Sequence, residues 1–267
     1  MTASTDFGLH RQRDRSGISL KALDQNQNSK YHMKTNHNTP TPSLLALIGV
    51  LGIAGNCHAA INIADWTFET SAPTTAGPFS PEIGSGSASG SHAGTTTYSS
   101  PAGNGSAHSF SSTAWAVGDY YQFQVSTHGN SGIALSWDQT SSNTGPRDYL
   151  LKYSTDGVNF TAFGSGYSVL ANASPNTPWS SSGMPNTAYS FSQDLSSITA
   201  LNNQDTVYFR LVDNSTTSAN GGAVASAGTD RVDNFIVSAV PEPAHWGLGA
   251  AVGLLGLSFL QRKLVQV

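Results

Sequence analysis

Side chains that carry oxygen atoms cluster near the start and near the end of residues 60–240. Asp65 and Glu69 lie in an alternating segment near the start, and Asp230, Asp233 and Asn234 lie in another near the end. If the first and last strands are neighbours, these oxygens converge, and hard oxygen ligands suit Ca²⁺. We therefore expect Asp233, with Asp65 or Glu69, to help hold a structural calcium ion. The alternative is that the acids and the amide bond local backbone.

Tryptophan side chains could stack on sugar rings if they are exposed. Trp137 alternates with Ile133 and Leu135, which favours a core position over a ligand platform. Trp115 is another candidate for such stacking. Trp179 lies in a loop rich in Pro, Ser and Gly, and we expect it to be exposed and available for ligand binding.

No catalytic arrangement is evident. Asp138 and Asp148 flank a loop and could be imagined as a glycosidase pair, but turn and strand-end roles suit them better. The serines include no GxSxG motif. His92, His108 and His128 show no spacing typical of a zinc site. The sequence predicts a protein that is not an enzyme.

The elements that would position these residues are short strands. Asp156-Gly157 lies between two alternating runs and predicts a hairpin. Alternation elsewhere predicts strands in these segments: 62–69, 119–125, 133–137, 149–153, 158–163, 189–191, 207–211 and 231–237. At most one helical turn is expected, near 195–201. We expect these side chains to be buried: Trp66, Phe123, Leu135, Trp137, Leu151, Phe209 and Phe235.

Eight to ten such strands with polar connections predict an all-β fold, a two-sheet antiparallel sandwich over residues 60–239. The hairpin LLKYSTDGVNFTAF and the last strand DRVDNFIVSA resemble those of jelly-roll modules related to carbohydrate-binding domains. The resemblance implies a jelly-roll-like sandwich, and related sugar-binding modules hold a structural calcium in a comparable place. Residues 70–106 contain GSGSASGSHAG and are expected to be partly flexible, whereas 172–186 is expected to be an ordered surface loop.

Charge narrows the choice of partners. Residues 60–240 carry 4 Lys/Arg and 12 Asp/Glu, a net charge of −8. So acidic a domain has little to neutralise phosphates, and no nucleic-acid partner is expected.

The C-terminal segment 240–267 combines three features in order. Pro241-Glu242-Pro243 is followed by an apolar run at 244–260 and by Arg262-Lys263. This arrangement resembles the PEP-CTERM sorting signal of Gram-negative bacteria that make extracellular polysaccharide. The resemblance implies recognition of the tripeptide by exosortase. The run is long enough for one transmembrane helix, with the basic pair left in the cytoplasm.

The N-terminal part predicts export. Residues 43–55 form an uncharged apolar run, and small residues follow it. We expect a signal peptide at 33–59, cut by signal peptidase after Ala59 or Ala60. Residues 1–32 fit no such signal and are interpreted as a disordered, mis-called extension with translation starting at Met33; an unusually long n-region is the alternative.

The predicted protein is therefore exported, held for a time in the inner membrane, and then placed at the cell surface or outside the cell. Its expected role is structural or adhesive, in a biofilm or exopolysaccharide matrix. One alternative is a carbohydrate-binding module for extracellular polysaccharide. A second is a secreted hydrolase with an unrecognised site. An exposed aromatic row would favour carbohydrate binding, and a cleft with two converging carboxylates would favour hydrolysis.

Overall fold

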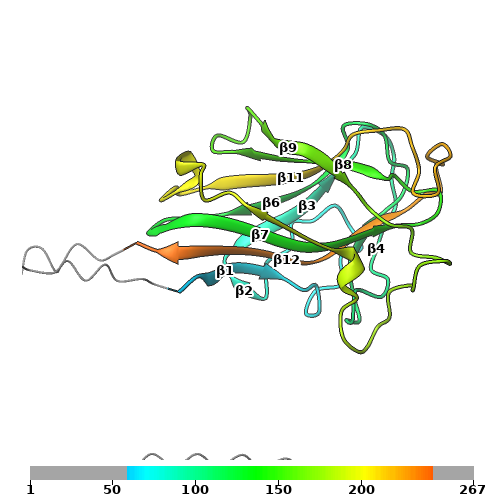
Figure 1. Cartoon of the computed structure of the whole chain (residues 1–267), viewed down its shortest axis with the longest axis horizontal. Coiled ribbons are helices and arrows are strands. Elements are labelled where there is room, and N and C mark those ends of the chain that lie inside the picture. Colours follow the sequence, from blue (N-terminus) through cyan, green and yellow to red (C-terminus); the bar gives the residue numbers. More distant parts are fainter. Residues whose placement is uncertain (1–58, 243–267) are drawn as a thin grey trace, which may run out of the picture. The chain divides into compact units, whose positions relative to one another are not determined.

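The computed structural model describes residues 59–242, which form two antiparallel β-sheets packed face to face (Figure 1). The seven-stranded sheet contains, in spatial order, β10 (Ser190–Asp194), β7 (Asn130–Ser141), β12 (Asp230–Pro241), β1 (Ile61–Trp66) and β2 (Ile83–Gly84), with β5 (Phe110–Ser112) also on β12 and β4 (Tyr98–Ser99) on β5. The five-stranded sheet contains β3 (Gly86–Ser91), β6 (Tyr120–Val125), β11 (Val207–Asp213), β8 (Asp148–Ser154) and β9 (Thr161–Ser168). The predicted two-sheet antiparallel sandwich is confirmed.

The only helices in the described part are two short 3₁₀ turns, η1 (Thr187–Tyr189) and η2 (Thr199–Leu201), and the second lies where a helical turn was expected. No helix among residues 59–242 has the length and apolar character that a membrane span needs. The predicted transmembrane run at 244–260, Pro243, Arg262-Lys263 and nearly all of the predicted signal peptide lie outside the described residues.

Strand β12 is the centre of the seven-stranded sheet. It pairs with β7 along most of its length, while its other edge pairs first with β5 and then with β1. The change of partner coincides with a bulge between Asp233 and Ile236, where Asn234 has a φ of 49°. As expected, the first and last strands are neighbours: Ile61 pairs with Ala239, so the two ends of the described chain lie side by side (Figure 1).

The core lies between the sheets and is built from aromatic side chains. All seven side chains expected to be buried are at most 2% exposed, so that prediction is confirmed. The Phe123 and Phe235 rings stack across the sheets with centroids 3.5 Å apart, and Trp66 meets both edge-on. Burying each of these side chains stabilises the fold by roughly 1.5–3 kcal/mol.

The 70–106 region, expected to be a partly flexible loop, contains the strands β2, β3 and β4. Small residues in a strand are not only a loop signal: Gly86, Ala88 and Gly90 alternate on the inner face of β3. A Cβ at Gly86 would lie 2.9 Å from the Trp66 ring, and one at Gly90 would lie 2.6 Å from the Tyr98 ring. The strand therefore needs glycine because large rings fill the space in front of it.

The predicted Asp156-Gly157 hairpin joins β8 to β9, with Gly157 at a φ of 74°. The strand after it was predicted to begin at Val158, but it begins at Thr161. The reason is local: the Asp156 carboxylate accepts the N–H groups of Val158 and Asn159, which holds them in the turn.

The domain extends past its predicted end at residue 239. Pro241 still pairs with Asn130, and the Glu242 N–H donates to the Gly129 carbonyl at 2.8 Å. The first two residues of the predicted sorting tripeptide thus lie at the C-terminal end of β12, where it pairs with β7 and the residue before it. At the N-terminal end of the described chain, Ala59 and Ala60 are exposed and directly precede β1.

We predict that Gly86→Ala destabilises the domain by about 1–3 kcal/mol, because the new methyl group would press on the Trp66 ring and the Gln124 carbonyl. Gly94→Ala is the matched control, since a Cβ there meets no atom within 4 Å. Chemical denaturation of both variants measures the effect. Equal midpoints for the two variants would contradict the packing role of β3.

Candidate functional site

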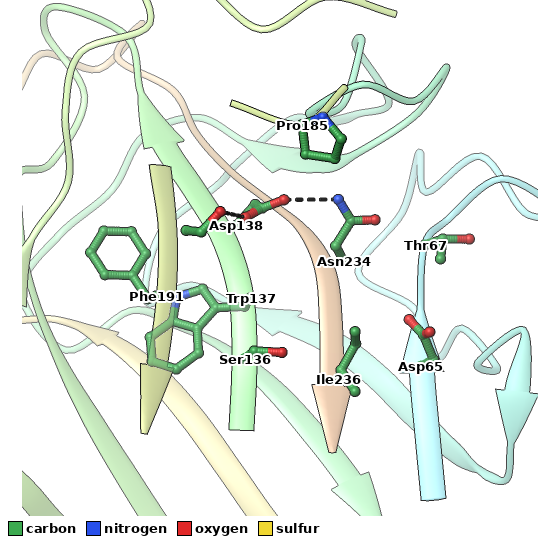
Figure 2. A pocket seen from close by; sticks show the side chains of 10 residues that line it. Asp65, Thr67, Ser136, Trp137, Asp138, Pro185, Phe191, Asn234 and Ile236 are labelled. Atoms are coloured by element: carbon green, nitrogen blue, oxygen red, sulfur yellow. Dashed lines mark hydrogen bonds between the residues drawn. The ribbon is translucent and has the colours of Figure 1, made fainter. Parts of the chain in front are cut away.

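A groove of about 360 Å³ lies on the outer face of the seven-stranded sheet (Figure 2). Its floor comes from β7, β12 and β1, whose outward residues include Ser136, Asp138, Asn234, Ile236 and Asp65. These positions alternate with core residues along each strand, so the same alternation that builds the core places this polar set outside. The groove is at the small end of the size range of ligand pockets, about 300–1,000 Å³.

Asp138 is held from two sides. Its carboxylate accepts the Ser190 hydroxyl at 2.5 Å from β10 and the Asn234 amide at 2.8 Å from β12 (Figure 2). Asn tolerates the left-handed conformation that the bulge requires, and a bulge re-aims the side chain it carries. The bulge therefore turns Asn234 toward Asp138 and fixes this carboxylate in the groove.

Asp65 is not held in this way. The residue is 8% exposed, and its Oδ1 atom is buried without a hydrogen-bond partner. Burial first, and then the charge of Glu82, raise the pKa of this carboxyl above its ordinary value. Buried polar atoms in native proteins almost always have a partner, so Oδ1 marks a place that a ligand group or a water molecule can satisfy.

The groove offers hydrogen-bond acceptors and hydroxyls next to short apolar surfaces. Ile236, Pro185 and Phe191 supply the apolar part, and no Lys or Arg lines it. Such a lining suits an uncharged, hydroxyl-rich ligand whose O–H groups donate to the carboxylates.

The structure does not gather the predicted calcium ligands. Asp65 pairs across to Ile236, beyond the bulge that carries Asp233. The Asp233 carboxylate accepts bonds from the Asn104 N–H at 2.9 Å, the Ser106 hydroxyl at 2.7 Å and the Asn234 N–H at 2.8 Å.

Glu69 is engaged elsewhere, since its carboxylate accepts the His108 N–H at 2.9 Å. No group of three or more His, Cys, Asp or Glu within residues 59–242 is arranged to hold a metal. The alternative of bonding to local backbone holds only for the Asn234 N–H on Asp233. Asn104 and His108 come from distant segments, and the Asn234 amide donates to Asp138.

Trp179, expected to be exposed, is 7% exposed, so that expectation is wrong. Its ring meets Tyr189 edge-on, with centroids 6.0 Å apart, and lies 5.8 Å from the Arg231 guanidinium. The Asn172 side-chain oxygen accepts the backbone N–H of Trp179 at 2.6 Å, which anchors the loop. Loop composition is a local property of the sequence, whereas this packing joins distant segments. Trp115 and Trp137 are buried as well.

Asp138 and Asp148 line different pockets. Asp148 begins β8 and borders a polar hollow of about 300 Å³ that does not include Asp138. Hydrogen bonds from the Arg147 guanidinium hold the pKa of Asp148 at about 2. The Asp148 carboxylate is thus engaged in an ion pair with Arg147.

Sequence reasoning missed a buried Ser–His–Asp chain. His92 Nε2 lies 3.0 Å from Ser112 Oγ, and its Nδ1 lies 2.9 Å from Asp119 Oδ2. The spacing is that of a nucleophilic triad, but Ser112 is fully buried, and the His92 and Asp119 side chains are 1% and 2% exposed. Burial lowers the pKa of His92 despite Asp119. The neutral imidazole links β3 to β5 and to the start of β6, and only the fold reveals it.

Two further acids, Asp230 and Asp213, are also buried. Asp230, expected among the converging oxygens of the first and last strands, is fully buried and accepts bonds from Gln139 and Ser141. Burial raises its pKa well above the ordinary value. Burial also raises the pKa of Asp213 to about 6, and its Oδ2 atom has no partner.

Comparisons with known proteins give likeness of fold only. No protein-family model and no curated protein matches the chain. One similar structure is the K1 cleaved adhesin domain of Lys-gingipain from Porphyromonas gingivalis, at 13% identity and a TM-score of 0.38, covering 67% of this chain and 97% of that chain. Another is the CBM22-2 xylan-binding domain of Paenibacillus barcinonensis Xyn10C, at 10% identity and a TM-score of 0.38, covering 67% and 99%. TmCBM61, solved with β-1,4-galactotriose, has 8% identity and a TM-score of 0.35, covering 64% and 92%. Similarity at this level transfers no ligand and no site.

We predict that Asp213→Asn stabilises the domain at pH 8 but not at pH 4. An acid with a pKa near 6 in the folded state and 3.8 as its ordinary value keeps its proton on folding. The contribution of Asp213 to the free energy of unfolding is then fully present below pH 4 and is lost as the pH rises through 6. A shift of two units corresponds to about 3 kcal/mol, which the neutral amide would recover at pH 8.

Denaturant unfolding at the two pH values measures this difference, with Asp205→Asn as the control because Asp205 is exposed. A variant whose stability relative to wild type is the same at pH 4 and pH 8 would rule out the buried, protonated Asp213.

Proposed function

We propose that this protein is an exported surface or matrix protein that adheres to polysaccharide, and that the groove on the seven-stranded sheet binds a neutral saccharide. The observation that carries the proposal is the unpartnered Oδ1 of Asp65, buried beside the fixed Asp138–Asn234 pair. This proposal joins the adhesive role with its carbohydrate-binding alternative, because adhesion to a matrix requires a surface that holds its polymer.

The lining of the groove supports a sugar over other small ligands. Asp65 and Asp138 are acceptors for hydroxyl donors, and Ser136 and Ser190 can give or accept bonds. Ile236 and Pro185 can pack against the C–H face of a ring. With every described tryptophan buried, a single site of this kind is weak, and repeated sites on a polymer would supply avidity.

A hydrolase is the less supported alternative. Glycosidases need one carboxyl kept as an acid and a second positioned across the bond. Asp138 is held by Ser190 and Asn234, and β12 separates its strand from that of Asp65. The arrangement favours binding over bond cleavage.

Export and sorting are part of the proposal. Signal peptidase would remove the leader before β1, and exosortase would act on Pro241-Glu242-Pro243 while the 244–260 run is in the inner membrane. Because Ile61 and Ala239 are paired, the described residues next to the two proposed cuts lie side by side at one end of β1 and β12.

We predict that Asp65→Asn weakens binding to a neutral polysaccharide about tenfold, since it removes a charged acceptor. Ser136→Phe should abolish binding, because the ring would fill the floor of the groove. Retardation of the exported protein in native gels containing xylan, β-galactan or dextran measures both effects.

Asp205→Asn is the control, with the same change of charge at an exposed position outside the groove. If none of the three polymers retards the wild type, or if Asp65→Asn migrates like the wild type, the groove is not a saccharide site.

We also predict that the intact mass of the protein from its native cells corresponds to a chain that starts at Ala60 or Ile61 and lacks everything after the Pro241-Glu242-Pro243 tripeptide. A full-length species with both apolar segments would contradict this processing. A chain cut at only one end would contradict the corresponding signal.

A further inference from the structure

The four basic side chains of the described domain are not equivalent. Arg147 forms an ion pair with Asp148 at 2.9 Å, and Arg231 is largely buried, with its guanidinium donating to the Ala102 carbonyl. Lys152 and Arg210 are different: within residues 59–242 neither has a carboxylate within ion-pair distance. They are also direct cross-strand partners on β8 and β11.

Two aromatic rings contact the Arg210 guanidinium. Its central carbon lies 3.9 Å from the centroid of Tyr120 and 3.5 Å from that of Phe160. Its Nε donates to Gln122 Oε1 at 2.8 Å, whereas its two terminal nitrogens donate to no described residue. The fork is therefore fixed in place before any partner arrives, with its bidentate edge unused.

Neutral polar side chains surround this pair on the outer face of the five-stranded sheet. The strand register places Ser89, Gln122, Arg210 and Lys152 in one row across β3, β6, β11 and β8. The next row, in the same order, contains Ser87, Gln124, Tyr208 and Ser154. Amides and hydroxyls next to two cations match a ligand that carries both acidic groups and many hydroxyls.

The positive charges of Lys152 and Arg210 also favour an anionic ligand. Like charges directly opposite each other in a sheet destabilise it, and no described carboxylate offsets this pair. The domain has 12 acidic residues in 60–240, yet none of those described lies within ion-pair distance of Lys152 or Arg210. An anion that bridges Lys152 and Arg210 would remove the repulsion and use the free edge of the guanidinium.

We propose that the outer face of the five-stranded sheet binds a carboxylate-bearing polysaccharide, one that contains uronic acids, with Arg210 and Lys152 on the carboxylate. This second surface goes beyond the neutral-saccharide groove and does not depend on it. Two cations on a domain of net charge −8 are too few for a nucleic acid, whose affinity grows with each phosphate neutralised.

The test is native gel retardation of the exported protein in gels that contain polygalacturonate, dextran or a single-stranded polynucleotide at low salt. Polygalacturonate should retard the wild type more than the other two polymers do. Lys152→Gln and Arg210→Gln should each weaken this binding about tenfold or more, because each removes a charged hydrogen-bond donor. Arg210→Lys should also weaken it, since an ammonium lacks the stacked planar fork.

Arg147→Gln is the matched control: it removes the same charge from a residue already paired with Asp148, and binding should stay within about twofold of wild type. A loss equal to that of Lys152→Gln would mean that only net charge matters and would overturn the proposal. Equal retardation by the polynucleotide, or none by polygalacturonate, would also overturn it. Asp65→Asn should leave polygalacturonate binding unchanged, so this surface and the groove can fail separately. Melting temperatures near that of wild type confirm that each variant is folded.

Discussion

The pairing of strand β12 on both of its edges is the constraint on which the rest of the structure depends. Three strands bond to it, and it changes partner from β5 to β1 at the Asn234 bulge. The bulge costs the ladder one residue but separates two environments. Above it, Asp230 and Val232 point into the core between β5 and β7; below it, Phe235 and Val237 return to the core against β1. A strand without the bulge would move the second set to the solvent face, because the side-chain period is two.

The same strand also organises the polar interior. The Asp230 carbonyl accepts the hydroxyls of Ser111 and Tyr121, while its carboxyl accepts Gln139 and Ser141. From Tyr121 the chain of bonds continues through Ser112 and His92 to Asp119. A fully satisfied buried network of this kind rigidifies the core, whereas a half-satisfied one is costly. It therefore selects one register of β5, β6, β7 and β12 over its slipped alternatives.

How far the sequence predicts this structure depends on the range of the contacts involved. Strands with large alternating residues, such as those around Phe123 and Phe209, were predictable because alternation is local. Strand β3 was not, since its need for Gly86 arises from Trp66 in a distant segment. Trp179 was misplaced for the same reason: Tyr189 and Arg231, which cover it, lie outside its own loop.

The groove was predictable only in parts. Asp65, Asp138 and Asn234 each stood out in the sequence, but as members of two different hypotheses. Their convergence requires the register of three strands and the left-handed turn at Asn234, neither of which a local pattern contains. The ring contacts of Arg210 were not predictable for the same reason. Tyr120, Phe160 and Arg210 come from three separate segments that only the fold brings together. Each sheet thus builds its outer face from its own register, an acidic groove on one and a cation pair on the other. Because Ile61 pairs with Ala239, both described ends of the domain leave from the same end of one strand pair, β1 and β12.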